Sequence, residues 1–98
     1  MNTQKISLAA GSDLKKSIED YGESNNLSGF VVSIVGDLAK AVFQCPNQAN
    51  VTSMSGKLEI ITLNGTIESG KVHLHLSLSD DKCNVWGGHL EHGSIVLK

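Results

Sequence analysis

The sequence predicts an α+β fold, in which one amphipathic helix packs on a mainly antiparallel β-sheet. Apolar residues recur at helical spacing only near the N-terminus, in residues 14–21. From residue 27 onward, β-branched runs bounded by glycine and alternation of apolar with polar residues indicate strands. Turn signals such as Asn64-Gly65 stand between these runs. A chain of 98 residues holds one small core, so residues 1–98 are expected to form a single domain.

The helix is expected to follow a short extended segment at residues 6–9. Ser12 or Asp13 can cap its free amide groups, and an acidic residue suits the positive end of the helix. The apolar stripe has the spacing i, i+4, i+7 and consists of Leu14, Ile18 and Tyr21. Gly22 weakens the helix, and Asn25-Asn26 are suitable residues for its end.

Strands are predicted at residues 29–36, 40–45, 57–63, 73–80, 85–90 and 94–97, with a polar loop at 46–55. Asn64-Gly65 permits two interpretations. It forms a hairpin turn, or the strand bends and continues through Ile67 with Gly65 at a close backbone approach. Further turns are expected at residues 68–71 and 80–82.

Composition limits the classes of partner. The net charge is −2, and the eight basic residues are all scattered lysines, so direct binding to duplex DNA is not expected. We find neither a targeting signal nor an apolar run long enough to span a membrane, which favours a cytoplasmic protein with Cys45 and Cys83 as free thiols. The low charge and small core suggest additional burial through self-association.

Three histidines give the strongest functional signal. His73 and His75 alternate with leucines on one predicted strand, so both point to the same face, and His89 returns on the next strand. Three neutral imidazoles that converge on one point suit a tetrahedral divalent metal ion such as zinc, with one position left open. The alternative is a hydrogen-bonded histidine cluster on a half-exposed face.

The register of the predicted hairpin connects this face to the core. If the residue numbers of each cross-strand pair sum to 162 or 164, the hairpin turn is centred near residues 81–82. His75 then lies opposite Gly87 or His89, respectively. On the other face, Leu76 then opposes Trp86 and Leu74 opposes Leu90. A slip of one residue destroys the apolar face, so the core and the histidine cluster require the same parity.

Other residues near this face are secondary candidates. Gly87 and Gly88 either leave open space over the histidines, for a metal ligand or a neighbouring chain, or permit a bulge or tight strand packing. Glu59 could accept a hydrogen bond from a ligand histidine or act as a general base, or it is simply a strand-edge carboxylate. Cys83 and His92 are weaker candidates for metal ligands.

In order along the chain, the motifs resemble those of the plant and prokaryote conserved (PPC) domain family. The residues that carry the resemblance are Gly11–Leu14, Gly29–Gly36 with Ala39 and Ala41, Gly56–Ile67, His73–Asp80, Gly87–Leu90 and Gly93. The resemblance implies a compact α+β fold that assembles as a homotrimer, and it maps the family's histidine positions onto His73, His75 and His89, where some prokaryotic members are thought to hold a metal. The fold also resembles that of acetolactate decarboxylase, an enzyme with a three-histidine zinc site.

The chain departs from the family pattern in two respects. The plant members combine the domain with AT-hook motifs and mediate nuclear protein association, but no AT-hook is present here. Members usually continue with another strand after the region that matches residues 94–97, whereas this C-terminus is shorter. That strand is missing, or a neighbouring subunit or the N-terminal segment covers the edge.

Three functions follow as hypotheses. The first is a homotrimeric binding or interaction module with a metal, zinc or another divalent ion, at the three histidines. The second is a small metal-dependent enzyme that acts on a carbonyl or carboxylate substrate, and the third is a DNA-associated protein that acts through protein partners. The sequence leaves open the metal, the substrate and whether any reaction is catalysed.

Overall fold

A computed structural model describes residues 2–98, with one helix and six strands in a single sheet. Helix α1 (Leu14–Ser24) is followed by β1 (Ser28–Val31), β2 (Asp37–Gln44), β3 (Thr52–Glu68), β4 (Lys71–Ser79), β5 (Val85–Leu90) and β6 (Ile95–Val96). All strand pairs are antiparallel, which confirms the predicted α+β class. Among residues 2–98, no helix has the length and apolar content that crossing a bilayer requires.

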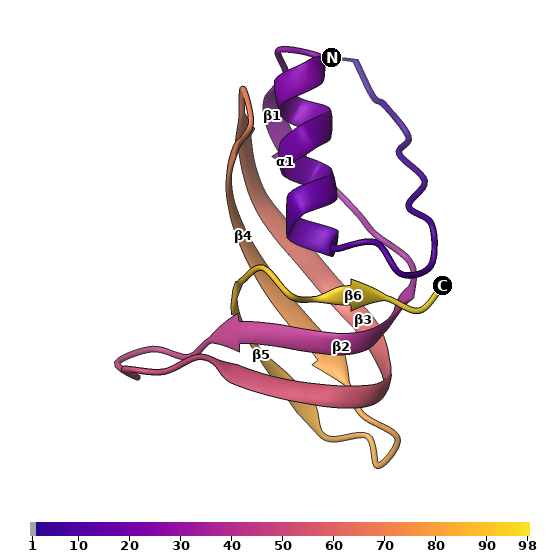
Figure 1. Ribbon diagram of the computed structural model, residues 1–98, viewed down its shortest axis with the longest axis vertical. Coiled ribbons are helices and arrows are strands. Elements are labelled where there is room, and N and C mark those ends of the chain that lie inside the picture. Colours follow the sequence, from indigo (N-terminus) through magenta and orange to yellow (C-terminus); the bar gives the residue numbers. More distant parts are fainter. Residues whose placement is uncertain (1) are drawn as a thin grey trace.

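The sheet curls until it meets itself. The strand order is β1-β3-β4-β5-β2-β6, and β2 also pairs with the first half of β3. Strands β2, β3, β4 and β5 therefore form a closed circuit, and β1 and β6 lie outside it. In Figure 1 the long strands β3 and β4 run beside α1, and β2 and β6 cross them at the lower end.

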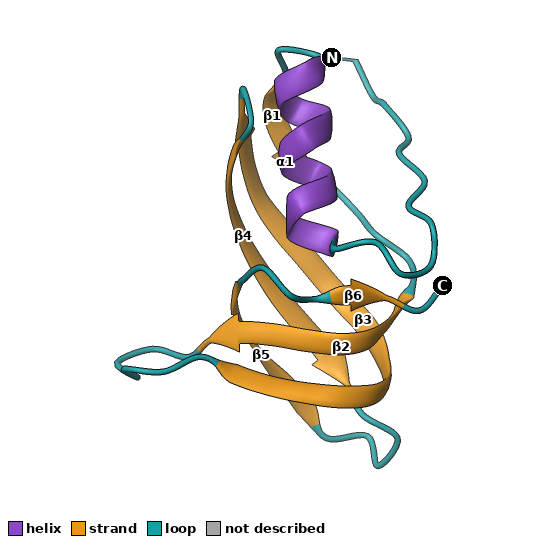
Figure 2. Cartoon of the chain, viewed as in Figure 1, coloured by secondary structure: helices purple, strands orange, loops and turns teal. Residues whose placement is uncertain are grey.

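Helix α1 lies against one face of this sheet (Figure 2), and the core side chains fill the space between them. Asp13 is the N-cap, since its carboxylate accepts a hydrogen bond from the Lys16 amide at 3.0 Å, and Asn25 is the C-cap, as predicted. The buried stripe of the helix is Leu14, Ile18 and Gly22, while Tyr21 is only half-buried. Gly22 lets the helix approach Ile67 closely, because a Cβ there would lie 2.7 Å from the Ile67 Cγ2 atom.

Strand β3 is longer than predicted. It starts at Thr52, inside the segment expected to be a loop, because residues 52–59 pair with β2. It then bends through Asn64-Gly65 and continues to Glu68, so the bent-strand interpretation is the correct one. A Cβ at Gly65 would lie 1.9 Å from the His73 carbonyl oxygen, and this close approach requires glycine. The hairpin turn is Ser69-Gly70, where both residues have positive φ, at 50° and 98°.

Strand β1 is shorter than predicted. The apolar run 29–36 was expected to be one strand, but only Ser28–Val31 pairs, with residues 65–68 of β3. The same edge of β3 is occupied by β2 at residues 52–59. Residues 32–36 therefore belong to neither ladder and connect the end of β1 to the start of β2. Val32 and Val35 are consequently 77% and 95% exposed.

The short C-terminal strand is covered by the N-terminal segment. Gly11 donates its amide proton to the Val96 carbonyl at 2.8 Å, and the Val96 amide donates to the Ser12 carbonyl at 2.9 Å. The opposite edge of β6 pairs with β2. Of the alternatives considered for this edge, the structure therefore has the N-terminal segment beside it.

The loop between β4 and β5 is organised by one carboxylate. Asp80 accepts hydrogen bonds from the Trp86 indole at 3.0 Å and from the Lys82 and Asn84 amides at 2.9 Å each. These donors, the Trp86 indole above all, lower the pKa of Asp80 below its usual value. Trp86 is held at this loop and remains 43% exposed.

Candidate functional site

Strand pairing brings the three histidines together on the outer face of the sheet. Along β4, Leu74 and Leu76 are buried, while His73 and His75 are exposed. The register of β4 and β5 places His75 directly opposite His89, which is one of the two partners predicted for it. The same register places Gly88 opposite Leu76 and Trp86 opposite Leu78. The expected Leu76–Trp86 pair was wrong, because every pair sums to 164 rather than 162.

The three imidazole rings form a tight cluster. Their centroids are separated by 5.1 Å for His73 and His75, 4.8 Å for His73 and His89, and 5.9 Å for His75 and His89. The rings are tilted, with interplanar angles of 57° to 75°. Within residues 2–98, no three His, Cys, Asp or Glu side chains have donor atoms already arranged around one point as a metal ion requires.

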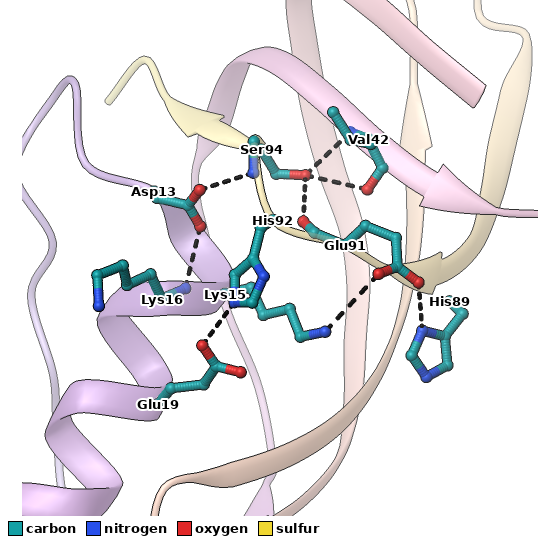
Figure 3. A network of polar contacts seen from close by, with 10 residues as sticks. Asp13, Lys15, Lys16, Glu19, Val42, His89, Glu91, His92 and Ser94 are labelled. Atoms are coloured by element: carbon teal, nitrogen blue, oxygen red, sulfur yellow. Dashed lines mark hydrogen bonds and ion pairs between the residues drawn. The ribbon is translucent and has the colours of Figure 1, made fainter. Parts of the chain in front are cut away.

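A carboxylate orients one of these rings (Figure 3). The His89 Nδ1 atom lies 3.0 Å from the Glu91 Oε2 atom. An ionised carboxylate only accepts hydrogen bonds, so Nδ1 carries the proton in this contact, which leaves Nε2 with its lone pair when the ring is neutral. The other oxygen of Glu91 faces the Lys15 ammonium group of α1 at 3.8 Å.

Three secondary candidates lie apart from the cluster. Glu59 pairs with Ser79 in the ladder, four residues along β4 from His75, or about 13 Å at the usual strand rise. Cys83 is exposed in the loop after β4. His92 instead contacts α1, with its Nε2 atom 2.6 Å from the Glu19 Oε1 atom. The structure therefore brings none of these three side chains to the histidine cluster.

Tight packing accounts for the two glycines of β5. A Cβ at Gly87 would lie 2.2 Å from the Leu76 carbonyl oxygen, and one at Gly88 would lie 2.4 Å from the Gln44 carbonyl oxygen. Of the roles considered for Gly87 and Gly88, these distances favour close strand packing. Open space occurs beside Gly88 instead. A surface hollow of about 640 Å³ is bounded by residues 44–48 on one side and by His75, His89 and Glu91 on the other.

Glu91 is the residue that our sequence analysis missed. The signal for it was present, because residues two apart on a strand point to the same face, and Glu91 follows His89 by two positions. The predicted strand ended at residue 90, however, and the structure extends the ladder by one contact. The Glu91 amide donates to the Val42 carbonyl at 3.0 Å.

The curled sheet, the single packed helix and the outward histidine cluster define a small α+β domain of the type that the sequence motifs suggested. The chain belongs to the Plants and Prokaryotes Conserved (PCC) domain family, whose model matches residues 1–98.

Known proteins resemble this chain in both sequence and fold. A Synechococcus sp. (strain JA-3-3Ab) protein described as bifunctional protein GlmU is 37% identical over 92 residues, which are 93% of this chain. The chain spans about 15% of the length of that relative. A hypothetical protein from Salmonella matches with a TM-score of 0.86 and 31% identity, over 91% of this chain and 65% of its own.

A further solved structure carries a description that refers to a metal. The metal-containing protein AF0104 from Archaeoglobus fulgidus matches with a TM-score of 0.67 and 25% identity, over 92% of this chain and 69% of its own. These neighbours share the fold of the chain.

Proposed function

We propose that this chain is a homotrimeric binding and interaction module of the PCC family that holds a divalent metal ion, zinc first among them, through His73, His75 and His89. The spacing of the three rings carries the proposal. A Zn–N distance of about 2.0–2.1 Å puts the centroid of a ligating ring about 3.2 Å from the ion, so tetrahedral ligands have centroids about 5 Å apart. The observed separations of 4.8–5.9 Å bracket that value.

Rotation of the rings of His73 and His75 is the movement that would direct their donor atoms to one point. The Cβ–Cγ bond of a histidine points through its ring centroid, so rotation about this bond redirects the nitrogens and leaves the centroid in place. The donor set suits zinc, since neutral imidazole is among its preferred ligands. The metal-containing description of AF0104 provides independent support.

Metal binding is tested by titration of the metal-free protein with Zn²⁺ in a calorimeter. We expect one ion per chain, and we expect the combined His73→Ala, His75→Ala and His89→Ala variant to lose it. His92→Ala is the matched control, because this histidine lies outside the cluster, and it should bind as the wild type does. Wild-type protein without affinity for Zn²⁺, or a triple variant with unchanged affinity, would refute the proposed site.

The homotrimer is supported by exposed apolar side chains beside the free edge of β1. Phe30 and Val32 are each 77% exposed and Val35 is 95% exposed, so three apolar side chains within six residues face solvent in the single chain. Sedimentation equilibrium should give three times the chain mass, and Phe30→Asp should shift the protein toward the monomer. A wild-type monomer at micromolar concentration would contradict this part of the proposal.

The free thiols of Cys45 and Cys83 agree with the proposed cytoplasmic setting.

The hollow beside His75 and His89 favours a second candidate, a small metal-dependent enzyme that acts on a carbonyl or carboxylate compound. A bound ion would supply a Lewis acid at one wall, and residues 44–48 form the other. Titration with ¹³C-labelled acetate, followed by NMR, tests this candidate. Acetate signals that shift with the zinc-loaded wild type, and not with the triple variant, would support it. Unchanged signals with both proteins would count against it.

A further inference from the structure

A chain of polar contacts connects the histidine cluster to the first turn of α1. We propose that Glu91 and Lys15 are positioning residues for His89. Glu91 fixes the ring with its proton on Nδ1 and leaves the Nε2 lone pair available, and Lys15 attracts the Glu91 carboxylate toward the helix. The inference rests on the proposed function only in naming a metal ion as the partner of Nε2.

Glu91 is held firmly enough to orient a ring. Its amide donates to the Val42 carbonyl at 3.0 Å, and its own carbonyl accepts from the Ser94 hydroxyl at 3.3 Å. One carboxylate oxygen contacts His89 at 3.0 Å and the other faces Lys15. A histidine that ligates a metal usually donates its other N–H to such a partner, which fixes both the tautomer and the orientation of the ring.

The position of Lys15 is explained by this contact rather than by the helix. A lysine in the first turn lies at the positive end of the helix dipole, where it is unfavourable. Lys16, in the same turn, is 67% exposed and pairs with Asp20 within the helix at 3.3 Å. The Lys15 side chain is only 13% exposed and points to Glu91. At 3.8 Å the two charged groups attract each other without a directional hydrogen bond, so Lys15 acts on Glu91 through its charge.

The same helix holds the segment after β5 at two further points (Figure 3). An Asp13 carboxylate oxygen accepts from the Gly93 amide at 2.6 Å, and Glu19 contacts His92. Residues 91–93 are therefore each fixed by a different residue of the first turns of α1 or its cap. The orientation of His89 depends on the docking of this helix, although no helical residue belongs to the histidine cluster.

The tautomer of His89 tests the inference without any metal. In ¹⁵N-labelled, metal-free protein at pH 8, the imidazole shifts and couplings should show the proton on Nδ1 of His89. Glu91→Ala should move the population toward Nε2–H, and Glu68→Ala, which removes an exposed carboxylate elsewhere, should not. A wild-type ring protonated on Nε2, or an unchanged tautomer in Glu91→Ala, would overturn the role of Glu91.

Zinc affinity provides the second readout. Loss of an outer partner of a ligand histidine weakens metal binding by about 10–100-fold, which is the effect expected for Glu91→Ala. Lys15→Met should weaken zinc binding by a smaller factor, and Lys16→Met is its matched control with no expected change. Equal affinities for these two lysine variants would overturn the role of Lys15. If wild-type protein shows the Nδ1–H tautomer but binds no zinc, the proposed function fails while the positioning role of Glu91 stands.

Discussion

The two faces of strand β4 differ sharply although they alternate along the same nine residues. Leu74, Leu76 and Leu78 face inward and are 1%, 3% and 0% exposed. His73 and His75 face outward and are exposed, and Ser77 continues the same polar side. The inner side chains pack against α1 and the opposite wall of the curled sheet, whereas the outer imidazoles contact mainly one another and His89.

Within this one strand, the inner side chains stabilise the fold and the outer ones form the proposed site. The inner face is fixed by packing, since each leucine fills space that no other element can fill. The outer face is fixed only by register, and its side chains can change without leaving a cavity. The histidine cluster should therefore be removable while the fold remains. Three substitutions test that division and a fourth tests the loop that follows β4, and they are given in order of expected effect.

Leu78→Ala should have the largest effect. Leu78 is fully buried, and truncation of such a leucine removes buried methyl groups and leaves a cavity, at a cost of about 2–5 kcal/mol in unfolding free energy. Urea denaturation measures the loss. Val85→Ala is the control, since Val85 is 66% exposed and should change stability by less than about 0.5 kcal/mol. Equal losses in the two variants would contradict the assigned faces.

Gly87→Ala should be the exception on the outer face. Its Cβ would lie 2.2 Å from the Leu76 carbonyl oxygen, so β4 and β5 would have to separate. Overpacking of this kind costs about 1–3 kcal/mol, and the ring signals of His75 and His89 should shift with it. Gly29→Ala is the control, because a Cβ there meets no atom within 4 Å. A Gly87→Ala protein as stable as the Gly29→Ala protein would show that the strands part easily.

Asp80→Asn should act mainly through pH. Hydrogen bonds to the ionised carboxylate lower its pKa in the folded protein, so its contribution to stability is complete above the usual value of 3.8 and is lost as the pH falls through the lower, folded value. The amide cannot titrate, and the variant should lose less stability than the wild type between pH 5 and pH 3. Urea midpoints across this range measure the difference. An unchanged pH profile in Asp80→Asn would refute the prediction.

His75→Ala should have the smallest effect on the metal-free protein. The ring is exposed and leaves no cavity, so the unfolding free energy should change by no more than about 0.5 kcal/mol. Urea denaturation of the metal-free protein measures this change in unfolding free energy. A loss above about 1 kcal/mol would mean that the outer cluster contributes to folding, and the division between the two faces would then fail.

Local patterns in the sequence were sufficient for the elements that depend on a few neighbouring residues. Asp13 is the N-cap because its side chain reaches an amide only three residues away. The alternation of His73–Leu78 fixes which residues share a face, and the need to bury the leucines fixes the parity of the hairpin. Those two constraints limit the partner of His75 to His89 or Gly87, and the ladder has His89.

Patterns that depend on distant strands were beyond the sequence. The run 29–36 has the composition of a strand throughout, but β2 occupies the edge of β3 that its second half would need. The polar residues 52–56 have little strand character, and they pair only because β2 lies beside them. For a similar reason the sequence pointed to Glu59, and not to Glu91, as the carboxylate near the histidines. Only the strand pairing shows that Glu59 lies at the far end of β4 and that Glu91 lies beside His89.

By itself, the sequence determined that the leucines of β4 face the core and that the three histidines share the outer face, because period-two alternation and the burial of leucine leave one consistent parity. The tertiary structure alone decided what surrounds those histidines. Closure of the sheet brings the end of β5 next to the first turn of α1. The Glu91 carboxylate therefore lies between His89 and Lys15. Such a contact joins residues that are 76 positions apart, and no local pattern encodes it.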